Sequence, residues 1–375
     1  MRPRFAVLLG VALAALTTIE STGVGARPRV PLIGAQPVVR LIPAPEVWLN
    51  GDVDSNSPSV WDLVDGVPRL HLFTSTAGVA RRSEGDAIET LSRAADVGWI
   101  GPTPQQGTWM EAVVADDQGV WYGYYHNERA GVVCGDTGKV LPRVGTARSA
   151  DRGLTWADLG PILEGPPGTS VCETTNHYFH GGVGDVSVML DNDREYLYLF
   201  FSQYLTDQTA QGVAVARMAW ASRDEPQGRV EVWSQGAWLP PAEMTDVEEN
   251  GAARQPAWVN AIGTPLFPTL RSWHDPEGVT DAYWGAAVHW NTYLSRYVML
   301  LNRAQDGRFT QQGIYVSFNE TLDPNSWSPP RLVLGGGRWY PQVIGLGEGG
   351  TDKLAGNMAR FFMSGQSTYF IEFSR

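Results

Sequence analysis

The feature of this sequence that most constrains its fold is a repeat of a short strand, a tight polar turn and a longer apolar strand. Four copies begin at Asp54, Glu111, Asp185 and Gly285, and the opening of a fifth lies at Tyr340. The starts lie 57, 74, 100 and 55 residues apart, which leaves room in each copy for a sheet of four strands and for insertions. A small sheet of this kind cannot bury both of its faces alone, so the copies must stack against one another.

The repeat predicts an all-β fold, and specifically a five-bladed β-propeller. Helical periodicity is scarce between residues 54 and 373, where short alternating or aromatic-rich runs are broken by Gly, Pro, Asn and Asp. Sheets that stack radially around an axis form a propeller, and five detectable copies indicate five blades. Because the sequence contains no low-complexity linker, we expect residues 27–375 to form a single domain.

Residues 1–26 have the pattern of a secretory signal peptide. Two arginines precede an apolar run from Phe5 to Leu16, and residues 24–26 fit a small-x-small cleavage site. This run is too short to span a bilayer, and no later segment is apolar over the length that a span needs. We therefore expect a mature protein that begins near Arg27, is secreted or periplasmic, and has no membrane partner once the signal peptide is cleaved.

The charge and the cysteine count narrow the range of partners. The net charge is -12 and the sequence has no run of Lys or Arg, which argues against nucleic acid and against an anionic membrane. Cys134 and Cys172 are the two cysteines, and in an oxidising compartment they can form one disulfide. A metal site would need more ligands at closer spacing than these two offer.

The stretch SADRGLTW, Ser149–Trp156, lies where the third strand of the second copy turns into the fourth. The aspartate can accept backbone N–H bonds across the turn, the glycine can supply a positive φ, and the tryptophan can pack between neighbouring sheets. The spacing resembles the Asp-box hairpin, S-x-D-x-G-x-T-W, of sialidases and several other propellers, where it lies away from the active site. We therefore predict a structural role for this stretch.

The starts of the repeats are the candidate catalytic site, because the first residues of a propeller's innermost strands face one end of its central funnel. They present three carboxylates from three blades, Asp54, Glu111 and Asp185. Like charges crowded into a partly desolvated pocket raise the pKa of at least one carboxyl and leave another ionised. One acid and one base are what the cleavage of a glycosidic bond requires.

Two of these starts resemble the blade openings of a known group of enzymes. Asp54-SNSPSVW and Asp185-VSVMLDNDREYLYLFF are similar to the D-P-S-V and D-P-S-x-F-x-D-D-x-G-x-x-Y-L-Y motifs of five-bladed propeller glycosidases. These include glycoside hydrolase family 43 and its relatives in families 32 and 117. The resemblance implies that Asp54 is the general base, that Asp185 tunes pKa values and orients the sugar, and that a glutamate from another blade is the general acid.

The chain departs from the family pattern in the position of the acid. The fourth blade begins with Gly285, so Glu111 on the second blade is the acid candidate and Glu128 is its substitute. Glu111 is a lone carboxylate among apolar neighbours, which is a costly position without a function. Asp185 follows a glycine-rich stretch that suits a close approach of substrate, but it can equally belong to a turn.

The chain also departs from the pattern at the base. Strict alignment of Pro58-Ser59-Val60 places Ser57, rather than Asp54, in the position of the family's aspartate. Asp54 therefore serves as the base only if the first strand begins differently from that of the family. Since Asp54 lies in a polar, turn-like stretch, the alternative is that it caps a loop.

Histidines are the next candidates near the funnel. His126, His180 and His289 either bind a sugar hydroxyl or are buried and hydrogen-bonded core residues. The resemblance also suggests His289 as a ligand of a central cation, such as a structural calcium ion. No histidine spacing typical of a catalytic metal occurs, so we expect no catalytic metal and no required cofactor.

Aromatic rings near the repeat starts can stack on the apolar faces of sugars. Trp284, Trp339 and Tyr340 are the leading candidates, although most of the tryptophans are expected to pack between blades. Arg143, Arg148 and Arg338 are candidates to pair with an acidic sugar. The wider set of aromatic residues near repeat starts is Trp109, Tyr122, Tyr124, Tyr125, Tyr178, Trp284, Trp290, Trp339 and Tyr340.

These features predict a secreted glycoside hydrolase that cleaves a poly- or oligosaccharide by carboxylate acid/base catalysis in the propeller funnel. One alternative is a sialidase-like hydrolase, which would need three arginines, a Tyr/Glu nucleophilic pair and usually several Asp boxes. Another is a non-catalytic carbohydrate-binding propeller, since a fold does not fix a function. The three carboxylates favour the hydrolase, because a binding module has little reason to keep unpaired acids together.

Overall fold

The computed structural model describes residues 36–375 except 50, 103–106, 132, 134, 136–137, 245–247, 250–251 and 254–256. These residues belong to one compact unit, Ala35–Arg375. The signal peptide expected at residues 1–26 lies outside the described residues, and so does Cys134. Cys172 is disulfide-bonded. Within the described part of the chain, no helix has the length and apolar character needed to cross a membrane.

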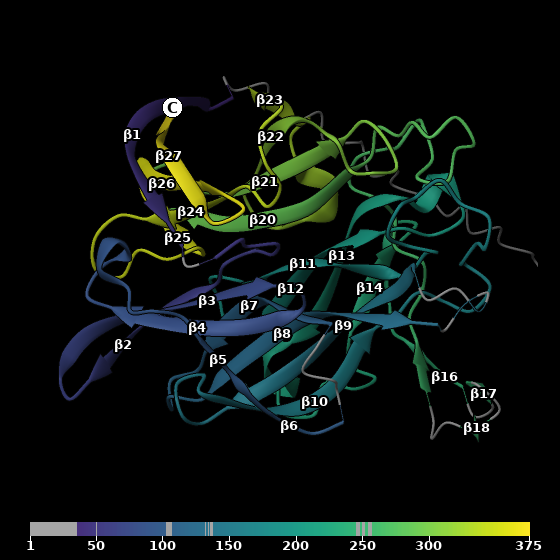
Figure 1. The fold of residues 1–375 in the computed structure, drawn as a ribbon, viewed down its shortest axis with the longest axis horizontal. Coiled ribbons are helices and arrows are strands. Elements are labelled where there is room, and N and C mark those ends of the chain that lie inside the picture. Colours follow the sequence, from purple (N-terminus) through teal and green to yellow (C-terminus); the bar gives the residue numbers. More distant parts are fainter. Residues whose placement is uncertain are drawn as a thin grey trace, which may run out of the picture. The chain divides into compact units, whose positions relative to one another are not determined.

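Five sheets form a five-bladed β-propeller, which confirms the predicted all-β fold (Figure 1). From the inner to the outer strand, blade 1 holds β2 (Ser59–Val64), β3 (Val67–Thr76), β4 (Val79–Gly85) and β5 (Ala95–Asp96). Blade 2 holds β7 (Thr108–Ala115), β8 (Trp121–Ala130), β9 (Val140–Ser149), β10 (Thr155–Leu163) and β6 (Gly98–Ile100). Blade 3 holds β11 (Val183–Leu190), β12 (Tyr196–Gln203), β13 (Gly212–Ala219), β14 (Glu231–Ser234) and β15 (Ala237–Leu239).

The last two blades depart from simple chain order. Blade 4 holds β20 (Tyr283–Asn291), β21 (Arg296–Ala304), β22 (Gln311–Asn319) and β23 (Arg331–Gly335), and β25 (Leu354–Ala355) pairs in parallel with β20. Blade 5 holds β24 (Gln342–Gly345), β26 (Met358–Met363), β27 (Gln366–Ser374) and β1 (Val38–Trp48). The N-terminal strand β1 is therefore the outer strand of the blade that ends the chain.

The remaining short elements lie between these strands. Two small ladders occupy the insertion before blade 4, where β16 (Ala242–Met244) pairs with β19 (Ala257–Val259) and β17 (Glu248–Glu249) pairs with β18 (Ala252–Ala253). The described 3-10 turns are η1 (Ile88–Thr90), η2 (Gln208–Ala210), η3 (Trp220–Ser222) and η4 (Pro324–Ser326).

The hydrophobic core is divided among the seams between neighbouring blades. Separate apolar clusters join blades 1 and 2, 2 and 3, 3 and 4, and 4 and 5, and a further cluster around Leu72 and Ile344 joins blade 5 back to blade 1. Successive residues of a strand point to opposite faces of its sheet, so the inner strands are apolar on both faces because each face meets another blade. The fifth seam closes the ring.

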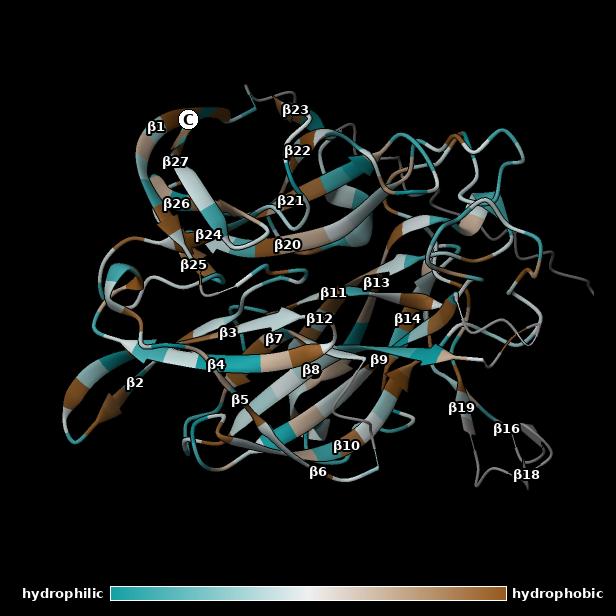
Figure 2. Cartoon of the chain, in the orientation of Figure 1, coloured by the Kyte–Doolittle hydropathy of each residue, from teal (hydrophilic) through white to brown (hydrophobic). Residues whose placement is uncertain are grey.

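Strand β4, the third strand of blade 1, differs in composition from these inner strands. Figure 2 shows β4, with the sequence VARRSEG, as a largely hydrophilic strand. Charged residues near the edge of a sheet discourage pairing with a second chain.

The Ser149–Trp156 turn joins β9 to β10, as predicted. The carboxylate of Asp151 accepts bonds from the Thr155 N–H at 2.9 Å, the Thr155 hydroxyl at 2.6 Å and the Ser149 hydroxyl at 2.8 Å. Gly153 has a φ of +76°, and Trp156 is fully buried with its ring 5.7 Å from that of Phe73 in blade 1. The turn therefore fixes the tryptophan that packs between blades 1 and 2.

Candidate active site

A pocket of about 240 Å³ is lined by residues from all five blades. The carboxylates predicted from the repeat starts, Asp54, Glu111 and Asp185, all line it, and so does Glu128. Carboxylates up to 131 positions apart in the sequence, from Asp54 to Asp185, therefore meet at one end of the inner strands. The complete lining among the described residues is Asp54, Trp109, Glu111, His126, Glu128, Tyr178, Phe179, Asp185, Trp284, Phe309, Trp339 and Tyr340.

Three inner strands carry a β-bulge at the level of this pocket. The pairing register shifts around Glu111 in β7, at Asp185 in β11 and at Gly285 in β20. Asp185 and Gly285 are each the third residue of their strand, and their φ angles are +43° and +55°. Bulges re-aim side chains and are frequent beside active sites. Gly285 therefore occupies in blade 4 the backbone position that Asp185 occupies in blade 3, and a Cβ atom there would lie 2.6 Å from the side-chain amide of Asn302.

Glu111 is the most deeply buried of the pocket carboxyls, with 1% of its surface exposed. Its Oε2 accepts the backbone N–H of Asn56 at 2.9 Å. Burial raises the pKa of Glu111 well above its ordinary value, and the charges of Asp185 and Asp54 raise it further, against the hydrogen bonds from Asn56. These effects keep a proton on Glu111 at pH values where an ordinary glutamate has lost it.

Asp54 lies at the edge of the pocket and is partly exposed. Its Oδ1 accepts the indole N–H of Trp109 at 2.8 Å, and its Oδ2 accepts the N–H of Ala77 at 3.2 Å. Burial raises the pKa of Asp54, and the charge of Glu128 adds to this, while the two hydrogen bonds oppose it. The carboxylate therefore bonds to the β3–β4 turn of blade 1 and to β7 of blade 2, and it also lines the pocket.

Asp185 is held by two phenols. Its Oδ2 accepts the hydroxyl of Tyr204, and its Oδ1 accepts the hydroxyl of Tyr340 at 3.0 Å. Burial raises the pKa values of Tyr204 and Tyr340, and the charge of Asp185 raises them further. The phenols consequently stay protonated and donate their hydroxyls to a carboxyl that is 3% exposed.

His126 links Asp185 to Glu128. The backbone N–H of Asp185 donates to Nδ1 at 2.9 Å, and Nε2 lies 3.3 Å from Oε1 of Glu128. Burial lowers the pKa of His126, but the hydrogen bond to Glu128 and the charge of Asp185 outweigh burial and raise it. Because Nδ1 accepts a bond, the ring carries its proton on Nε2 and donates to Glu128.

Aromatic rings form the walls of the pocket. Phe309 is in contact with several of them, since its ring centroid lies 5.0 Å from that of Trp284, 5.4 Å from that of Tyr178 and 6.3 Å from that of Trp339. Behind it, Trp273 stacks on Phe309 with a centroid distance of 4.2 Å. A pocket with aromatic walls and a few converging polar groups is the usual form of a small-molecule or sugar site.

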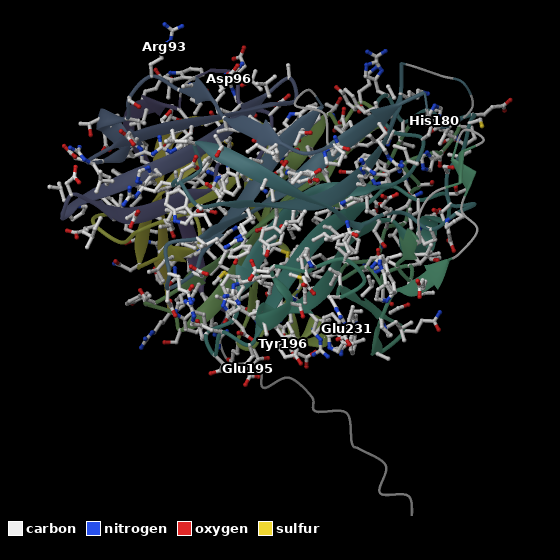
Figure 3. The ribbon with its side chains drawn as sticks, turned by 90° about the horizontal axis from the view of Figure 1, so that it is seen from below. Arg93, Asp96, His180, Glu195, Tyr196 and Glu231 are labelled. Carbon is white, nitrogen blue, oxygen red and sulfur yellow. The ribbon has the colours of Figure 1, made fainter. Side chains whose placement is uncertain are left out.

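Several residues proposed from the sequence do not line this pocket. His180 is buried, lies near one edge of the drawn ribbon in Figure 3, and is 2.8 Å through Nδ1 from the carbonyl oxygen of Val171. His289 is buried beside Phe373, at a centroid distance of 5.6 Å. The other aromatic residues outside the lining are Tyr122, Tyr124 and Tyr125, which pack in the seams of blade 2, and Trp290, which packs on Tyr297.

The candidate arginines also lie elsewhere. Arg143 pairs with Glu164 at 3.2 Å, Arg148 with Asp224 at 3.4 Å, and Arg338 lies over the ring of Trp48. Each of these side chains has a partner outside the pocket, and none of the described lining residues is a lysine or an arginine.

The residues around His289 do not fit the central cation that the family resemblance suggests. Burial and the charge of Lys353 together lower the pKa of His289 to about 3. The ammonium of Lys353 lies 3.2 Å from the carboxylate of Asp352 and 3.2 Å from the hydroxyl of Ser187. A positive charge is therefore already present beside the histidine, and the described residues contain no group of three or more metal-ligating side chains.

Sequence reasoning missed four residues that shape the site. Asn56 supplies the N–H that holds Glu111, and Tyr204 supplies one of the phenols that hold Asp185. Phe179 and Phe309 form part of the wall. None of the four lies at a repeat start, so the pattern that marked the carboxylates did not mark them.

Several solved structures are similar to this chain at low sequence identity. The structure is similar to an endo-arabinase from Bacteroides thetaiotaomicron VPI-5482, with 11% identity, a TM-score of 0.49, and coverage of 85% of this chain and 93% of that one. It is also similar to a thermostable family-43 glycoside hydrolase, with 10% identity, a TM-score of 0.45, and coverage of 90% and 89%. A third similar structure is an α-L-arabinofuranosidase from Podospora anserina in complex with cellotriose, with 12% identity, a TM-score of 0.45, and coverage of 88% and 94%.

No model of a protein family matches the chain, and no curated protein matches it. At identities of 10–12% and TM-scores below 0.5, these similarities assign neither an activity nor residue roles to this chain.

Proposed function

We propose that this protein is a glycoside hydrolase that cleaves a neutral poly- or oligosaccharide by carboxylate acid/base catalysis. The observation that carries the proposal is the pairing of a buried, protonated carboxyl, Glu111, with the partly exposed carboxyl of Asp54 in one aromatic-walled pocket. Glycosidic cleavage needs one group that protonates the leaving oxygen and a second that activates water or attacks the anomeric carbon.

The environments of the carboxyls divide these roles. Glu111 is the proposed general acid, because burial and neighbouring charge keep it protonated. Asp54 is the proposed base, because it is the more exposed group and both of its oxygens are oriented by hydrogen bonds. Asp185, which accepts hydrogen bonds from two phenols, is proposed to raise the pKa of Glu111 and to orient the sugar.

The charge of the pocket favours a neutral sugar over an acidic one. Four carboxyls line it, and none of its described lining residues is a lysine or an arginine. An anionic substrate would meet repulsion without a compensating guanidinium. This disfavours the sialidase-like alternative, which needs three arginines around its substrate.

The proposed reaction uses side-chain carboxyls and water, and we propose no cofactor for it. We further propose that the protein acts after export, in the secreted or periplasmic state that residues 1–26 predict. Carbohydrate is the proposed partner. Nucleic acid is not proposed, since the net charge of -12 opposes it.

The proposal is tested by incubating the purified chain with a panel of plant, algal and bacterial-envelope glycans and measuring released reducing ends. Glu111→Gln, Asp54→Asn and Asp185→Asn should each lower kcat by about 10²–10⁴-fold on a glycan that is cleaved. Asp193→Asn, in the exposed tip between β11 and β12, is the matched control and should keep full activity.

The outcomes separate the competing functions. Full activity in a pocket variant would remove that residue from the mechanism. Binding of a glycan without cleavage, unchanged by Glu111→Gln, would instead support the non-catalytic carbohydrate-binding propeller.

A further inference from the structure

A second pocket, of about 420 Å³, lies at the seam where blade 1 meets blade 5. Its walls come from the β2–β3 hairpin, the segment around η1, the loop that follows β24, and Arg360 of β26. Arg360 is 3% exposed and lies over the ring of Phe370 at 5.0 Å. The floor of this pocket is therefore made of packed residues of blade 5.

The second pocket lies at the opposite ends of the inner strands from the candidate active site. Strand β24 follows Tyr340, which lines the first pocket, and ends at Gly345, which lines the second. Five residues of extended chain span about 17 Å. The two pockets are therefore separate sites at opposite ends of the segment that contains β24. A sugar bound in one pocket leaves the other pocket free.

One aromatic ring of the second pocket is fixed in place. The indole N–H of Trp61 donates to the carbonyl oxygen of Gly350 at 2.9 Å. Trp61 is partly exposed and lies opposite Leu70 in the pairing of β2 with β3. A half-exposed tryptophan whose polar end is already bonded offers its apolar surface to a ligand.

Polar groups surround this ring. Arg69 forms an ion pair with Asp86, and both line the pocket with the exposed carboxylates of Glu89 and Glu348. Carboxylates accept hydrogen bonds from hydroxyl groups, and a guanidinium donates to hydroxyl oxygens. Three carboxylates against two guanidiniums, one of them already paired, disfavour an anionic ligand.

We propose that this second pocket binds a segment of a neutral polysaccharide, which stacks a sugar ring on Trp61 and bonds its hydroxyls to the surrounding charged groups. The inference rests on the proposed function for the class of its ligand. The site would hold the polymer against the protein while a chain is cleaved in the first pocket. Such a tether raises the effective concentration of substrate at the active site.

The test measures retention of the full chain in affinity gels that contain each polysaccharide of the panel, in the Glu111→Gln background so that no polymer is cleaved. Trp61→Ala should weaken retention by about tenfold, the factor that a ring contact of this kind contributes. Ala87→Leu, which fills the pocket without removing a ligand group, should weaken it similarly and guards against a folding defect of Trp61→Ala. Trp48→Ala is the control, because Trp48 is 50% exposed and lines neither pocket.

In the protein that retains Glu111, the Trp61→Ala variant should cleave a short oligosaccharide with an unchanged kcat/KM and the polymer with a lower kcat/KM. Equal retention of Trp61→Ala, Ala87→Leu and the parent would overturn the inference, even if the polymer is cleaved. Retention that depends on Trp61 without any cleavage would support the second site and refute the proposed hydrolase. An equal loss of retention in Trp48→Ala would also refute the site, because it would show non-specific adhesion.

Discussion

At the scale of single residues, the site depends on the carboxyl of Glu111, which is buried where an ionised group loses its hydration. Glu111 gains one backbone hydrogen bond from Asn56, which does not offset the loss of water around a group that is 1% exposed. The raised pKa is the result, since a protonated carboxyl avoids most of that cost. Asp185 is buried to a similar extent, but two phenols donate to it. The two buried carboxyls therefore differ in the hydrogen-bond donors that they receive.

The Glu111→Gln variant should be more stable than the parent above about pH 4.5. The pKa of Glu111 is raised in the folded state, so its contribution is complete below the ordinary value of 4.5 and is lost as the pH rises toward the folded value. Within that window the parent loses up to about 1.4 kcal/mol per pH unit relative to the variant. Thermal unfolding from pH 4 to pH 8 measures this difference.

The control for this measurement is Glu195→Gln, an exposed glutamate at the tip between β11 and β12 that points away from the ribbon in Figure 3. Its unfolding temperature should follow that of the parent at every pH. A parent and a Glu111→Gln variant with parallel pH profiles would show that Glu111 titrates like an exposed glutamate, which would contradict its assignment as the acid.

The sequence allowed part of this site to be predicted at residue scale. Glu111 and Asp185 stand at repeat starts, so the pattern that defines the blades also places them at one end of the inner strands. Tyr204 and Asn56 gave no such signal. Tyr204 follows the end of β12 and Asn56 lies in the loop before β2, and the contacts of these segments with the carboxyls depend on the whole fold. His289 lies on an inner strand, as predicted, but its side chain does not line the pocket. The strand to which a residue belongs does not determine how far along the funnel its side chain lies.

At the scale of elements, hairpin turns decide which rings pack between blades. The Ser149–Trp156 turn is held by the Asp151 carboxylate, and its tryptophan is fully buried between blades 1 and 2. Burial raises the pKa of Asp151, but the hydrogen bonds from Thr155 and Ser149 outweigh it and lower the pKa. The turn is therefore most stable when this aspartate is ionised.

Asp151→Ala should destabilise the protein by about 1–2 kcal/mol at pH 7, since the variant loses a carboxylate that satisfies backbone and hydroxyl donors. Because the pKa is lowered in the folded state, the stabilisation is present above the ordinary value of 3.8 and is lost as the pH falls below it. Urea unfolding at pH 7 and pH 3 should therefore show a smaller difference at pH 3. Asp193→Ala serves as the exposed control, and an equal effect of both variants would refute the structural role of the turn.

At the scale of the whole molecule, the number of blades was predictable and the closure of the ring was not. Five repeat starts gave five blades, because each start marks an inner strand that must be apolar on both faces. Strand β1 was missed since Pro43 and Pro45 interrupt its pattern. Proline is tolerated there because β1 is an outer strand, and the backbone groups on its outer side need no partner in the sheet. The pairing with β27 also shifts in register between Pro43 and Val47.

Removal of β1 should open the ring at its last blade. This strand pairs with β27 from Val38 to Trp48, as Figure 1 shows beside the C-terminus, and its Val39 and Leu41 pack on the core between blades 4 and 5. A chain that begins at residue 49 leaves β27 as an unpaired edge and exposes that core, so it should unfold at least about 10 °C below a chain that begins at residue 36. Differential scanning calorimetry of the two truncations measures the shift. Equal unfolding temperatures would show that the fourth strand of blade 5 is not needed to close the propeller, and that the apolar cluster around Leu72 and Ile344 holds the seam between blades 5 and 1 without β1.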